Sequence, residues 1–410
     1  MKADVAIVGA ELDGLVAAIR LAELGCNVAV IASAAGSLHY AAGGIHLLGY
    51  LRNGAGREEV VEPFVAVVRL DGKHPYSLAG AVRVREALDW SAQLLSGDFG
   101  IAARTSERNE LGLTPTGLRQ PIWLPTAHQA TIGRINGRKT TIVRFDGHMD
   151  FPADLMLAGL KRSGIDAACI AVGPPGPLRD NTGIARNFDR MRDTAAYFAT
   201  IRQELPAGTE IVLMPAVLGL VRHREIVSAA QSALGMPVFE VPTLPPSVPG
   251  LRWTRSLETL LAEKRATIRK NVRIVHAERD GDRIHSISDE NGRTIEAGAF
   301  VLATGGVLMG GLDVDAAGQV SETAFNLDVV QGRPLVAGSP SATLAALHCS
   351  GIETDDRLRP TLNGSGAIRN LFVTGRTLAH WHPAEEISAE GVSIVTGWMA
   401  AGCAHAVLEG

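Results

Sequence analysis

The sequence predicts an α/β fold in which one parallel sheet is built from two separated stretches of the chain. Short apolar runs, typical of buried strands, alternate with segments of helical periodicity, and this alternation favours parallel strands. Residues 4–31 contain the first such unit, and strand-like runs that end in glycine turns return at residues 299–306 and 370–375. With 410 residues, the chain is long enough for two domains, one inserted into the other.

The opening unit is a strand, a helix and a second strand. Residues 4–8 are apolar, residues 12–24 carry apolar side chains at helical spacing, and residues 28–31 are again apolar. Gly25 suits the left-handed position that follows many helices. Two short strands around one helix predict a βαβ unit, whose crossover is expected to be right-handed.

The rest of the chain predicts further α/β units, an antiparallel meander and a final helix. The α/β units comprise expected strands at residues 140–143, 167–172, 210–214 and 238–241 and expected helices at residues 152–162 and 223–234. The meander is expected at residues 272–278, 283–289 and 294–296, followed by strands at 299–303 and 370–373 and a helix at 389–408.

Composition and charge exclude several classes of function. The chain has 39 basic and 43 acidic residues, and without a basic excess we expect no nucleic-acid partner. The four cysteines lie far apart and form no CxxC pair, so we expect neither a zinc site nor a cysteine-ligated iron–sulfur cluster. The longest uncharged run, residues 297–312, is shorter than the roughly 20 apolar residues that cross a bilayer. We therefore expect no direct membrane insertion.

The turn after the first strand has the spacing of a dinucleotide-binding fingerprint, with one exception. Gly9 would make the tight turn, and Gly14 would let the helix pack closely against the strand. The middle position, where the backbone should approach a pyrophosphate, is Glu11. A carboxylate there would repel the phosphates but suits a helix N-terminus, so a plain strand–turn–helix is the alternative. The second strand ends in Ala32-Ser33 and offers only Ser33 to a ribose.

Two later turns favour a flavoprotein. Thr304-Gly305 follows the meander, and Gly375-Arg376 precedes the last helix. Two-domain flavoproteins use turns of these types, in this order, to close on FAD. Arg376 stands where an aspartate is usual, and an arginine can pair with phosphate and offset Glu11.

These motifs predict a Rossmann-like FAD/NAD(P)-binding domain with an inserted α/β substrate domain. We expect the nucleotide-binding domain to comprise residues 1–75 and 271–410, and the inserted substrate or cap domain to comprise residues 76–270.

Over most of its length the chain resembles the B-subunit family of the anaerobic, quinone-linked glycerol-3-phosphate dehydrogenase. That family is itself similar to the succinate dehydrogenase and fumarate reductase flavoproteins. The blocks that carry the resemblance are Ser37–Tyr40 leading to Gly43, His74–Leu78, Thr114-Pro115 with Gly117 and Trp123, Gly147 with Met149–Phe151, and Pro242–Val248 with Gly250.

The resemblance implies a flavin cofactor, FAD or FMN, and the oxidation of sn-glycerol 3-phosphate to dihydroxyacetone phosphate with hydride transfer to flavin. It also implies a second flavoprotein subunit and an iron–sulfur, membrane-anchoring subunit as partners. The chain itself would be cytoplasmic and would reach the inner membrane only through a partner.

Four positions depart from the pattern expected of a flavin site: Glu11, Ala32, Arg376 and Glu390. The alternative is therefore a non-catalytic partner that keeps the FAD fold, has lost flavin binding and scaffolds a catalytic or iron–sulfur subunit. A monomeric flavin oxidase acting on an amine or hydroxyacid is a third hypothesis.

The catalytic candidates are histidines. His39 lies in a stretch similar to the one along the isoalloxazine ring in the succinate dehydrogenase class, beside Gly43 and Gly44. His380 and His382 follow the late glycine turn. Any of the three could remove the hydroxyl proton as hydride leaves, and a hydrogen-bonded structural role is the alternative for His39.

Other candidates would hold the flavin ring or the substrate. Gly391 opens the final helix, where the pyrimidine edge of a flavin accepts charge, and Glu390 beside it is a poor neighbour for reduced flavin. The substrate candidates are His74, Tyr76, Ser247 and Arg252. The alternatives are structural roles. His74 and Tyr76 would belong to a turn that leads into a helix, Ser247 would belong to a pocket wall, and Arg252 would be a surface residue.

Overall fold

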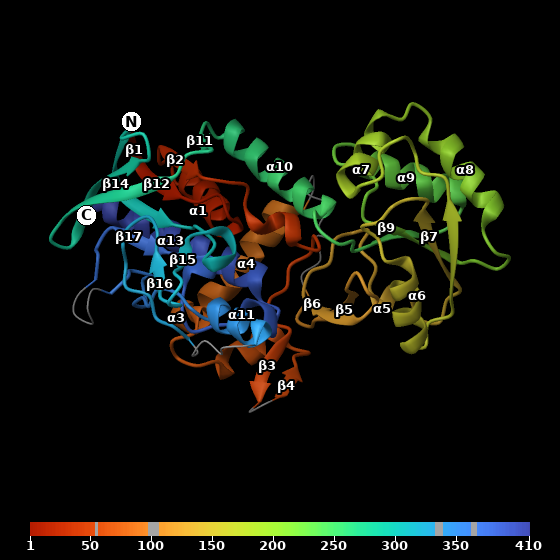
Figure 1. Ribbon diagram of the computed structural model, residues 1–410, viewed down its shortest axis with the longest axis horizontal. Helices are drawn as coiled ribbons and strands as arrows, with labels where there is room; N and C mark the ends of the chain where they lie inside the picture. Colours follow the sequence, from red (N-terminus) through yellow and green to blue (C-terminus); the bar gives the residue numbers. More distant parts are fainter. Residues whose placement is uncertain (54–55, 97–105, 333–338, 362–366) are drawn as a thin grey trace. The chain divides into compact units, whose positions relative to one another are not determined.

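The computed structural model describes residues 1–410 except 54–55, 97–105, 333–338 and 362–366. The chain forms two compact units (Figure 1). The nucleotide-type unit comprises residues 1–37, 46–93 and 257–410, and the inserted unit comprises residues 38–45 and 94–256. The first unit is built on a mixed sheet with parallel central strands and the second on a parallel sheet, which confirms the predicted α/β class.

The nucleotide-type unit is organised by a seven-stranded sheet in the order β11-β2-β1-β14-β13-β12, with β17 paired to β14. Its parallel strands are β1 (Lys2–Val8), β2 (Val28–Ala32), β11 (Thr267–Lys270), β14 (Thr294–Leu302) and β17 (Leu371–Val373). The antiparallel strands are β12 (Ile274–Asp280) and β13 (Arg283–Asp289). Val8 aligns with Ile31 on one side and Leu302 on the other, so the carboxyl ends of the central strands share one edge.

Strand β14 corrects the sequence-based prediction. Residues 294–296 and 299–303 were expected as two strands, but Thr294–Leu302 is continuous. Its first residues pair antiparallel with β13, and the rest pairs parallel with β1. One extended segment therefore ends the meander and also lies at the centre of the parallel sheet.

Two apolar helices cover the centre of this unit. Helix α1 (Leu12–Glu23) and helix α13 (Ala389–Glu409) pack against each other, and α13 also contacts β14 and β17. Among the described residues, α13 is the one helix with the length and hydropathy to span a membrane, and 61% of its apolar window is buried inside the protein. Such burial is typical of the core helix of a globular unit.

The other elements of the nucleotide-type unit are short. They are β3 (Tyr50–Asn53), β4 (Gly56–Glu59), α2 (Pro63–Ala66), η2 (Val67–Arg69), α3 (Pro75–Ala79), η4 (Val307–Met309), β15 (Leu312–Val314), β16 (Val320–Glu322), α11 (Pro340–His348), η5 (Gly375–Thr377) and α12 (Pro383–Glu386). Helix α4 (Ala81–Leu95) continues into the inserted unit, and the 3-10 turn η1 (Ser37–Tyr40) also spans both units.

The inserted unit contains a four-stranded parallel sheet in the order β10-β9-β7-β8. Its strands are β7 (Thr140–Phe145), β8 (Ala167–Val172), β9 (Ile211–Pro215) and β10 (Val238–Val241). Its helices are α5 (Ile132–Ile135), α6 (Ala153–Arg162), α7 (Asn181–Arg190), α8 (Thr194–Glu204), α9 (His223–Leu234) and α10 (Val248–Glu263, which extends past the unit), and β5 (Glu110–Leu113) with β6 (Arg119–Ile122) forms a hairpin.

This second sheet is buried on both faces. Val143 and Phe145 belong to one apolar cluster, with Phe188 and Phe198 from α7 and α8. Ile142, next to Val143 in β7, belongs to the cluster on the other face. Alternate residues of a strand point to opposite faces, so helices on each side complete a core.

The boundaries of the units differ from the expected insertion at residues 76–270. Residues 76–93 and 257–270 belong to the nucleotide-type unit, and residues 38–45 belong to the inserted unit. Helix α3 packs on α13, and β11 pairs with β2, so both segments complete the first sheet and its cover. Helices α4, α7, α8 and α10 were not predicted.

Candidate functional site

The carboxyl edge of the first sheet brings together the expected cofactor residues of the nucleotide-type unit. Gly9 has φ 112°, and a Cβ there would lie 1.9 Å from the Ala303 carbonyl oxygen. A Cβ at Gly14 would lie 2.9 Å from the Ala303 Cβ. The two glycines therefore allow the close packing predicted for them. The expected residues at this edge are Gly9, Glu11, Gly14, Ser33, Thr304, Gly305, Gly375 and Arg376.

The Glu11 side chain folds across the turn and is only 5% exposed. One carboxylate oxygen accepts the Ser37 backbone N–H at 2.8 Å, and the other accepts the Ser37 hydroxyl at 2.5 Å. A Cβ on Gly305 would lie 3.0 Å from the Glu11 carboxyl carbon. Burial raises the pKa of Glu11, while the Ser37 hydrogen bonds and then Arg376 act in the opposite direction. Both Ser37 donors are therefore already used by the Glu11 carboxylate.

Asp13 is a second buried acid at the same edge. It is 1% exposed and accepts a hydrogen bond from the Thr374 hydroxyl at 2.6 Å. Burial raises its pKa to about 7, Thr374 opposes the rise and the neighbouring Glu11 adds to it. A Cβ on Gly375 would lie 2.5 Å from the Asp13 carboxyl carbon, which explains the glycine. This edge of the sheet therefore holds two buried acids.

Residues from other parts of the chain also contact the N-terminus of α13. The Gly391 N–H donates to the His46 carbonyl at 3.0 Å, and a Cβ on Gly391 would lie 2.2 Å from the Tyr76 hydroxyl oxygen. The Glu390 carboxylate lies 3.0 Å from His46 Nδ1. Burial raises the pKa of Glu390, but His46 outweighs it and the net shift is downward.

A cavity of about 500 Å³ in the nucleotide-type unit is lined by three of the predicted residues, His74, His380 and His382. Lys73 and Arg52 also line it; the Lys73 ammonium lies 2.6 Å from Glu353, and the Arg52 guanidinium lies 3.6 Å from Glu385. Both cationic side chains are more than half exposed. The structure therefore joins these histidines in one basic cavity.

Hydrogen bonds assign different roles to the three histidines. His74 Nδ1 accepts the Tyr76 N–H at 3.0 Å, and His382 Nδ1 accepts the Glu385 N–H at 3.2 Å. In a neutral ring the proton then sits on Nε2, which for His74 donates to Glu386 at 3.0 Å. His380 has φ 67°, and its Nε2 lies 3.6 Å from Glu353. The His380 Nε2 is buried and makes no hydrogen bond to the described residues, so no such bond fixes the tautomer of this ring.

The other predicted residues belong to the inserted unit. A Cβ on Gly43 would lie 2.5 Å from Pro249, and one on Gly44 would lie 2.4 Å from Ile122, so both glycines allow close packing. The Ser247 hydroxyl accepts the Gly250 N–H at 3.1 Å. His39 accepts the Ser247 N–H through its carbonyl, and its ring lies 4.0 Å from the Tyr40 ring, tilted by 44°.

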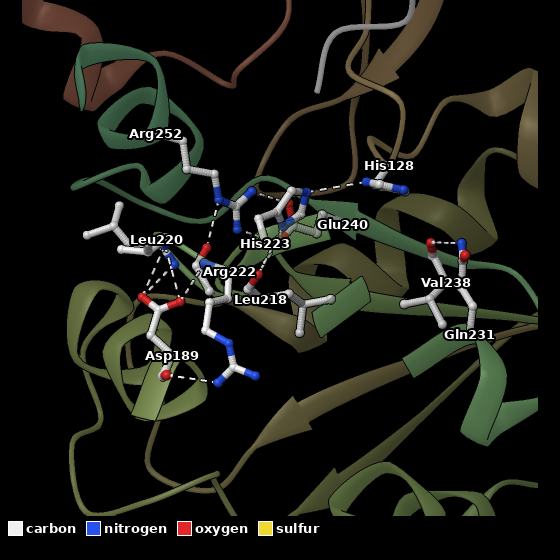
Figure 2. A network of polar contacts seen from close by, with 12 residues as sticks. His128, Asp189, Leu218, Leu220, Arg222, His223, Gln231, Val238, Glu240 and Arg252 are labelled. Atoms are coloured by element: carbon white, nitrogen blue, oxygen red, sulfur yellow. Dashed lines mark hydrogen bonds and ion pairs between the residues drawn. The ribbon is translucent and has the colours of Figure 1, made fainter. Parts of the chain in front are cut away.

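Arg252 lies in a polar network that the sequence did not indicate (Figure 2). Its guanidinium donates to both oxygens of the buried Glu240, at 2.7 and 2.9 Å. Arg252 is therefore the internal partner of a carboxylate, not the surface residue of the alternative prediction. Glu240 also accepts the Leu218 N–H at 2.9 Å. Burial raises the pKa of Glu240, but Arg252 and His223 outweigh burial and hold it at about 2.

Two histidines extend this network. His223 Nδ1 lies 2.9 Å from the Leu218 carbonyl, and its Nε2 lies 3.3 Å from His128 Nδ1. Burial, and then Arg252, lower the pKa of His223 to about 4. His128 and His223 are far apart in the sequence, and neither lies in a motif, so no sequence pattern could have joined them. Within the described ranges, no group of three or more His, Cys, Asp or Glu side chains is arranged to hold a metal ion.

The fold and this sheet edge define a class, and comparison with known proteins agrees. The FAD binding domain family model matches residues 4–392, and the chain belongs to that family of flavin-dependent oxidoreductases. Its relatives place it further, in the B-subunit family of the anaerobic glycerol-3-phosphate dehydrogenase. The protein of that name from Yersinia enterocolitica is 30% identical over 97% of this chain and 96% of its own length. The one from Pectobacterium atrosepticum is 30% identical over 97% of both chains.

Solved structures of flavoenzymes resemble the fold at low identity. A flavocytochrome c3 fumarate reductase has a TM-score of 0.46 at 11% identity, covering 99% of this chain and 78% of its own. A 3-ketosteroid Δ1-dehydrogenase from Sterolibacterium denitrificans has a TM-score of 0.44 at 11% identity, covering 99% of this chain and 100% of its own.

Flavin is the cofactor of this family, but two recognition positions of this chain do not fit FAD in the usual way. The diphosphate would meet the Glu11 carboxylate, which already holds the Ser37 donors. The pyrimidine edge would meet a helix N-terminus whose Gly391 N–H is bonded to His46. The cavity beside Gly9 and Ser33 is about 50 Å³, well below the roughly 300 Å³ at which small-molecule pockets begin.

Proposed function

We propose that the chain is the B-subunit of a complex that oxidises sn-glycerol 3-phosphate to dihydroxyacetone phosphate. In this proposal a flavin of the complex accepts the hydride, and the electrons pass to quinone. The supporting observation is the similarity to relatives of that name over 97% of the chain. The proposed partners are a second flavoprotein subunit and an iron–sulfur, membrane-anchoring subunit, with this chain cytoplasmic and peripheral to the inner membrane.

The basic cavity suits the substrate of this reaction. A phosphate monoester needs cations, and Lys73 and Arg52 line the cavity with more than half of each side chain exposed. Their present partners Glu353 and Glu385 are themselves partly exposed, and ion pairs between exposed groups contribute little to stability. A doubly charged phosphate can therefore displace the carboxylates at small cost.

Within this cavity the structure favours His380 as the group that takes the hydroxyl proton. His74 and His382 are fixed as Nε2–H donors by the backbone bonds to their Nδ1 atoms. The His74 Nε2–H is already given to Glu386, so His382 would orient the substrate oxygens, whereas His380, whose tautomer no such bond fixes, would accept the proton. Glu353, 3.6 Å away, would stabilise the imidazolium that forms.

Substitutions in the assembled complex test these roles. His380→Asn should lower kcat by about 10²–10⁴-fold, the range for loss of a general base. Lys73→Ala should mainly raise KM. His276→Asn, an exposed histidine on β12, is the matched control and should change neither. An unchanged kcat for His380→Asn would remove the base assignment, while loss of all glycerol 3-phosphate turnover in the control would point to assembly instead.

A second candidate function, a scaffold subunit without flavin, is favoured by the residues at the sheet edge. The Glu11 carboxylate occupies the turn where a diphosphate is expected, and the His46 carbonyl accepts the Gly391 N–H at the N-terminus of α13. Such a chain would stabilise a catalytic or iron–sulfur partner through its retained fold. It should be colourless when purified and should still co-purify with a cysteine-rich partner.

Flavin content separates the two candidates. The wild-type chain is measured by visible absorbance and by acid extraction, beside Glu11→Gly and the matched Glu23→Gly at the other end of α1. About one flavin per wild-type chain excludes the scaffold. A colourless wild type that gains flavin only in Glu11→Gly supports it.

A further inference from the structure

A second large cavity, of about 560 Å³, lies in the nucleotide-type unit and shares no residue with the sheet edge or the histidine cavity. Its walls come from α1, the start of α4, residues 356–359 and 369–372, and the C-terminal half of α13. Five arginines line it: Arg20, Arg83, Arg357, Arg359 and Arg369. One carboxylate, Asp356, lines it with them. No role assigned above uses this cavity.

The arginines are only partly neutralised. Arg20 pairs with Glu23 at 3.3 Å, Arg359 with Asp355 at 2.7 Å, and Arg369 with Asp282 at 2.5 Å, and none of these three acids lines the cavity.

Two arginines have no ion pair among the described residues, Arg83 and Arg357. The Arg83 side chain makes a single long bond, 3.4 Å, to the Ala79 carbonyl. Guanidinium groups with so few acceptors beside a cavity leave several donors for a bound anion.

The floor of the cavity is apolar. Phe372 and Met399 are buried, and Trp398 lies beneath Arg20, whose guanidinium carbon is 5.7 Å from the ring centroid. The Trp398 Nε1–H is buried without a hydrogen-bond partner. Buried donors are seldom left unpaired in proteins. The other apolar side chains of the lining are Leu24, Ala406 and Val407.

We propose that this cavity binds a phosphate ester that carries an apolar group. The phosphate lies between Arg83 and Arg357, whose forked donors match its oxygens. The apolar part lies on the floor beside Trp398 and Phe372. A volume of about 560 Å³ is within the roughly 300–1,000 Å³ of small-molecule sites. An anionic phospholipid and a soluble phosphate ester share this chemistry.

Calorimetric titration of the full chain tests the site. The probes are dihexanoyl phosphatidylglycerol below its micellar concentration, inorganic phosphate, and dihexanoyl phosphatidylcholine, whose choline cation should be repelled by the arginines. Phosphatidylglycerol should bind most tightly, and its affinity should fall as salt is raised. Equal binding of inorganic phosphate and phosphatidylglycerol would overturn the apolar part of the site.

Two matched double variants distinguish binding in this cavity from a general effect of surface charge. Arg83→Ala with Arg357→Ala should weaken phosphatidylglycerol binding at least about tenfold, which corresponds to about 1.4 kcal/mol. Arg279→Ala with Arg293→Ala removes the same charge at exposed positions outside the cavity and should leave binding unchanged. Equal weakening in both pairs would overturn the proposal.

Cys403 provides a readout inside the cavity. The thiol lines it, and Cys169 of the inserted unit serves as the reference thiol. Alkylation, followed by mass spectrometry at each cysteine, should slow at Cys403 and not at Cys169 when phosphatidylglycerol is bound. No protection of Cys403 at saturating ligand would contradict the placement. Sedimentation with phosphatidylglycerol vesicles identifies a membrane lipid as the source, whereas binding of the short-chain ester alone identifies a soluble one.

Discussion

Buried carboxylates in the two units behave in opposite ways. Glu240 of the inserted unit is 4% exposed and Asp13 of the nucleotide-type unit is 1% exposed, yet their pKa values are about 2 and about 7. Burial raises the pKa of both acids. The difference is the partner: Glu240 receives two donors of the Arg252 guanidinium, whereas Asp13 receives one hydroxyl and faces Glu11. Burial alone therefore does not decide whether a carboxylate is charged.

The comparison also separates two uses of buried charge. The Glu240 network joins α10 to β10 and the turn before α9, and its groups are mutually satisfied. Glu11 and Asp13 instead lie at the carboxyl edge of the first sheet, in a chain of the FAD binding domain family. The stability of the protein does not require two acids with raised pKa values at this edge.

The largest expected effect comes from removing the partner of Glu240. Arg252→Met should destabilise the protein by about 3–5 kcal/mol at pH 7, because it leaves a buried carboxylate uncompensated. Urea unfolding followed by tryptophan fluorescence measures it, with Arg144→Met, the exposed residue of β7, as control. Since Glu240 titrates below its ordinary 4.5, its contribution is present above that pH and lost as the pH falls towards 2. A deficit of equal size at pH 3 and pH 7 would contradict the pairing.

Substitution of Asp13 is expected to have the opposite effect, an increase in stability. Its pKa is raised from 3.8 to about 7, so the folded protein binds the extra proton between these values and loses stability as the pH rises through them. Asp13→Asn cannot ionise and keeps an acceptor for Thr374. It should be more stable than wild type by up to about 4 kcal/mol at pH 8, with no gain below pH 3.8. Thermal unfolding at pH 4, 6 and 8 measures the difference, and a gain independent of pH would refute the explanation.

The smallest expected effect is at Ser37. Ser37→Ala removes the hydroxyl donor to Glu11 and leaves the backbone donor in place. The loss should be about 1.5–3 kcal/mol, the contribution of one hydrogen bond to a charged group. Ser232→Ala, exposed on α9, is the control. If Ser37→Ala were neutral at pH 8, Glu11 would not depend on this turn for its charge.

Local sequence signals explain why part of the fold could be predicted. The first βαβ unit was confirmed, because an apolar run, helical periodicity and a terminal glycine all lie within residues 2–32. Helices α7 and α8 were missed, since residues 181–204 carry many polar side chains and their apolar face is visible only against the second sheet. The two strands expected around residue 297 are one strand, because pairing on both sides keeps the whole segment extended.

The candidate site could also be predicted only in part. Glu11 could be recognised as unusual from its place in a glycine motif, but Ser37, its partner, lies 26 residues further along the chain. The histidines of the basic cavity were candidates by position, yet only their backbone contacts assign the Nε2 proton of His74 and His382. His128, His223 and the cavity of five arginines had no sequence signal, because their members come from separate elements.

By itself, the sequence determined that this chain is an α/β protein with a dinucleotide-type opening and an altered fingerprint. Those features depend on side-chain periodicity and on glycines within a few residues of one another. Only the tertiary structure decided what Glu11 does. The turn after β2 brings the Ser37 donors to its carboxylate, and burial against Gly305 removes the water that would otherwise solvate it. Hydrogen-bond partners and desolvation are set by which segments meet in space, and that information is not local.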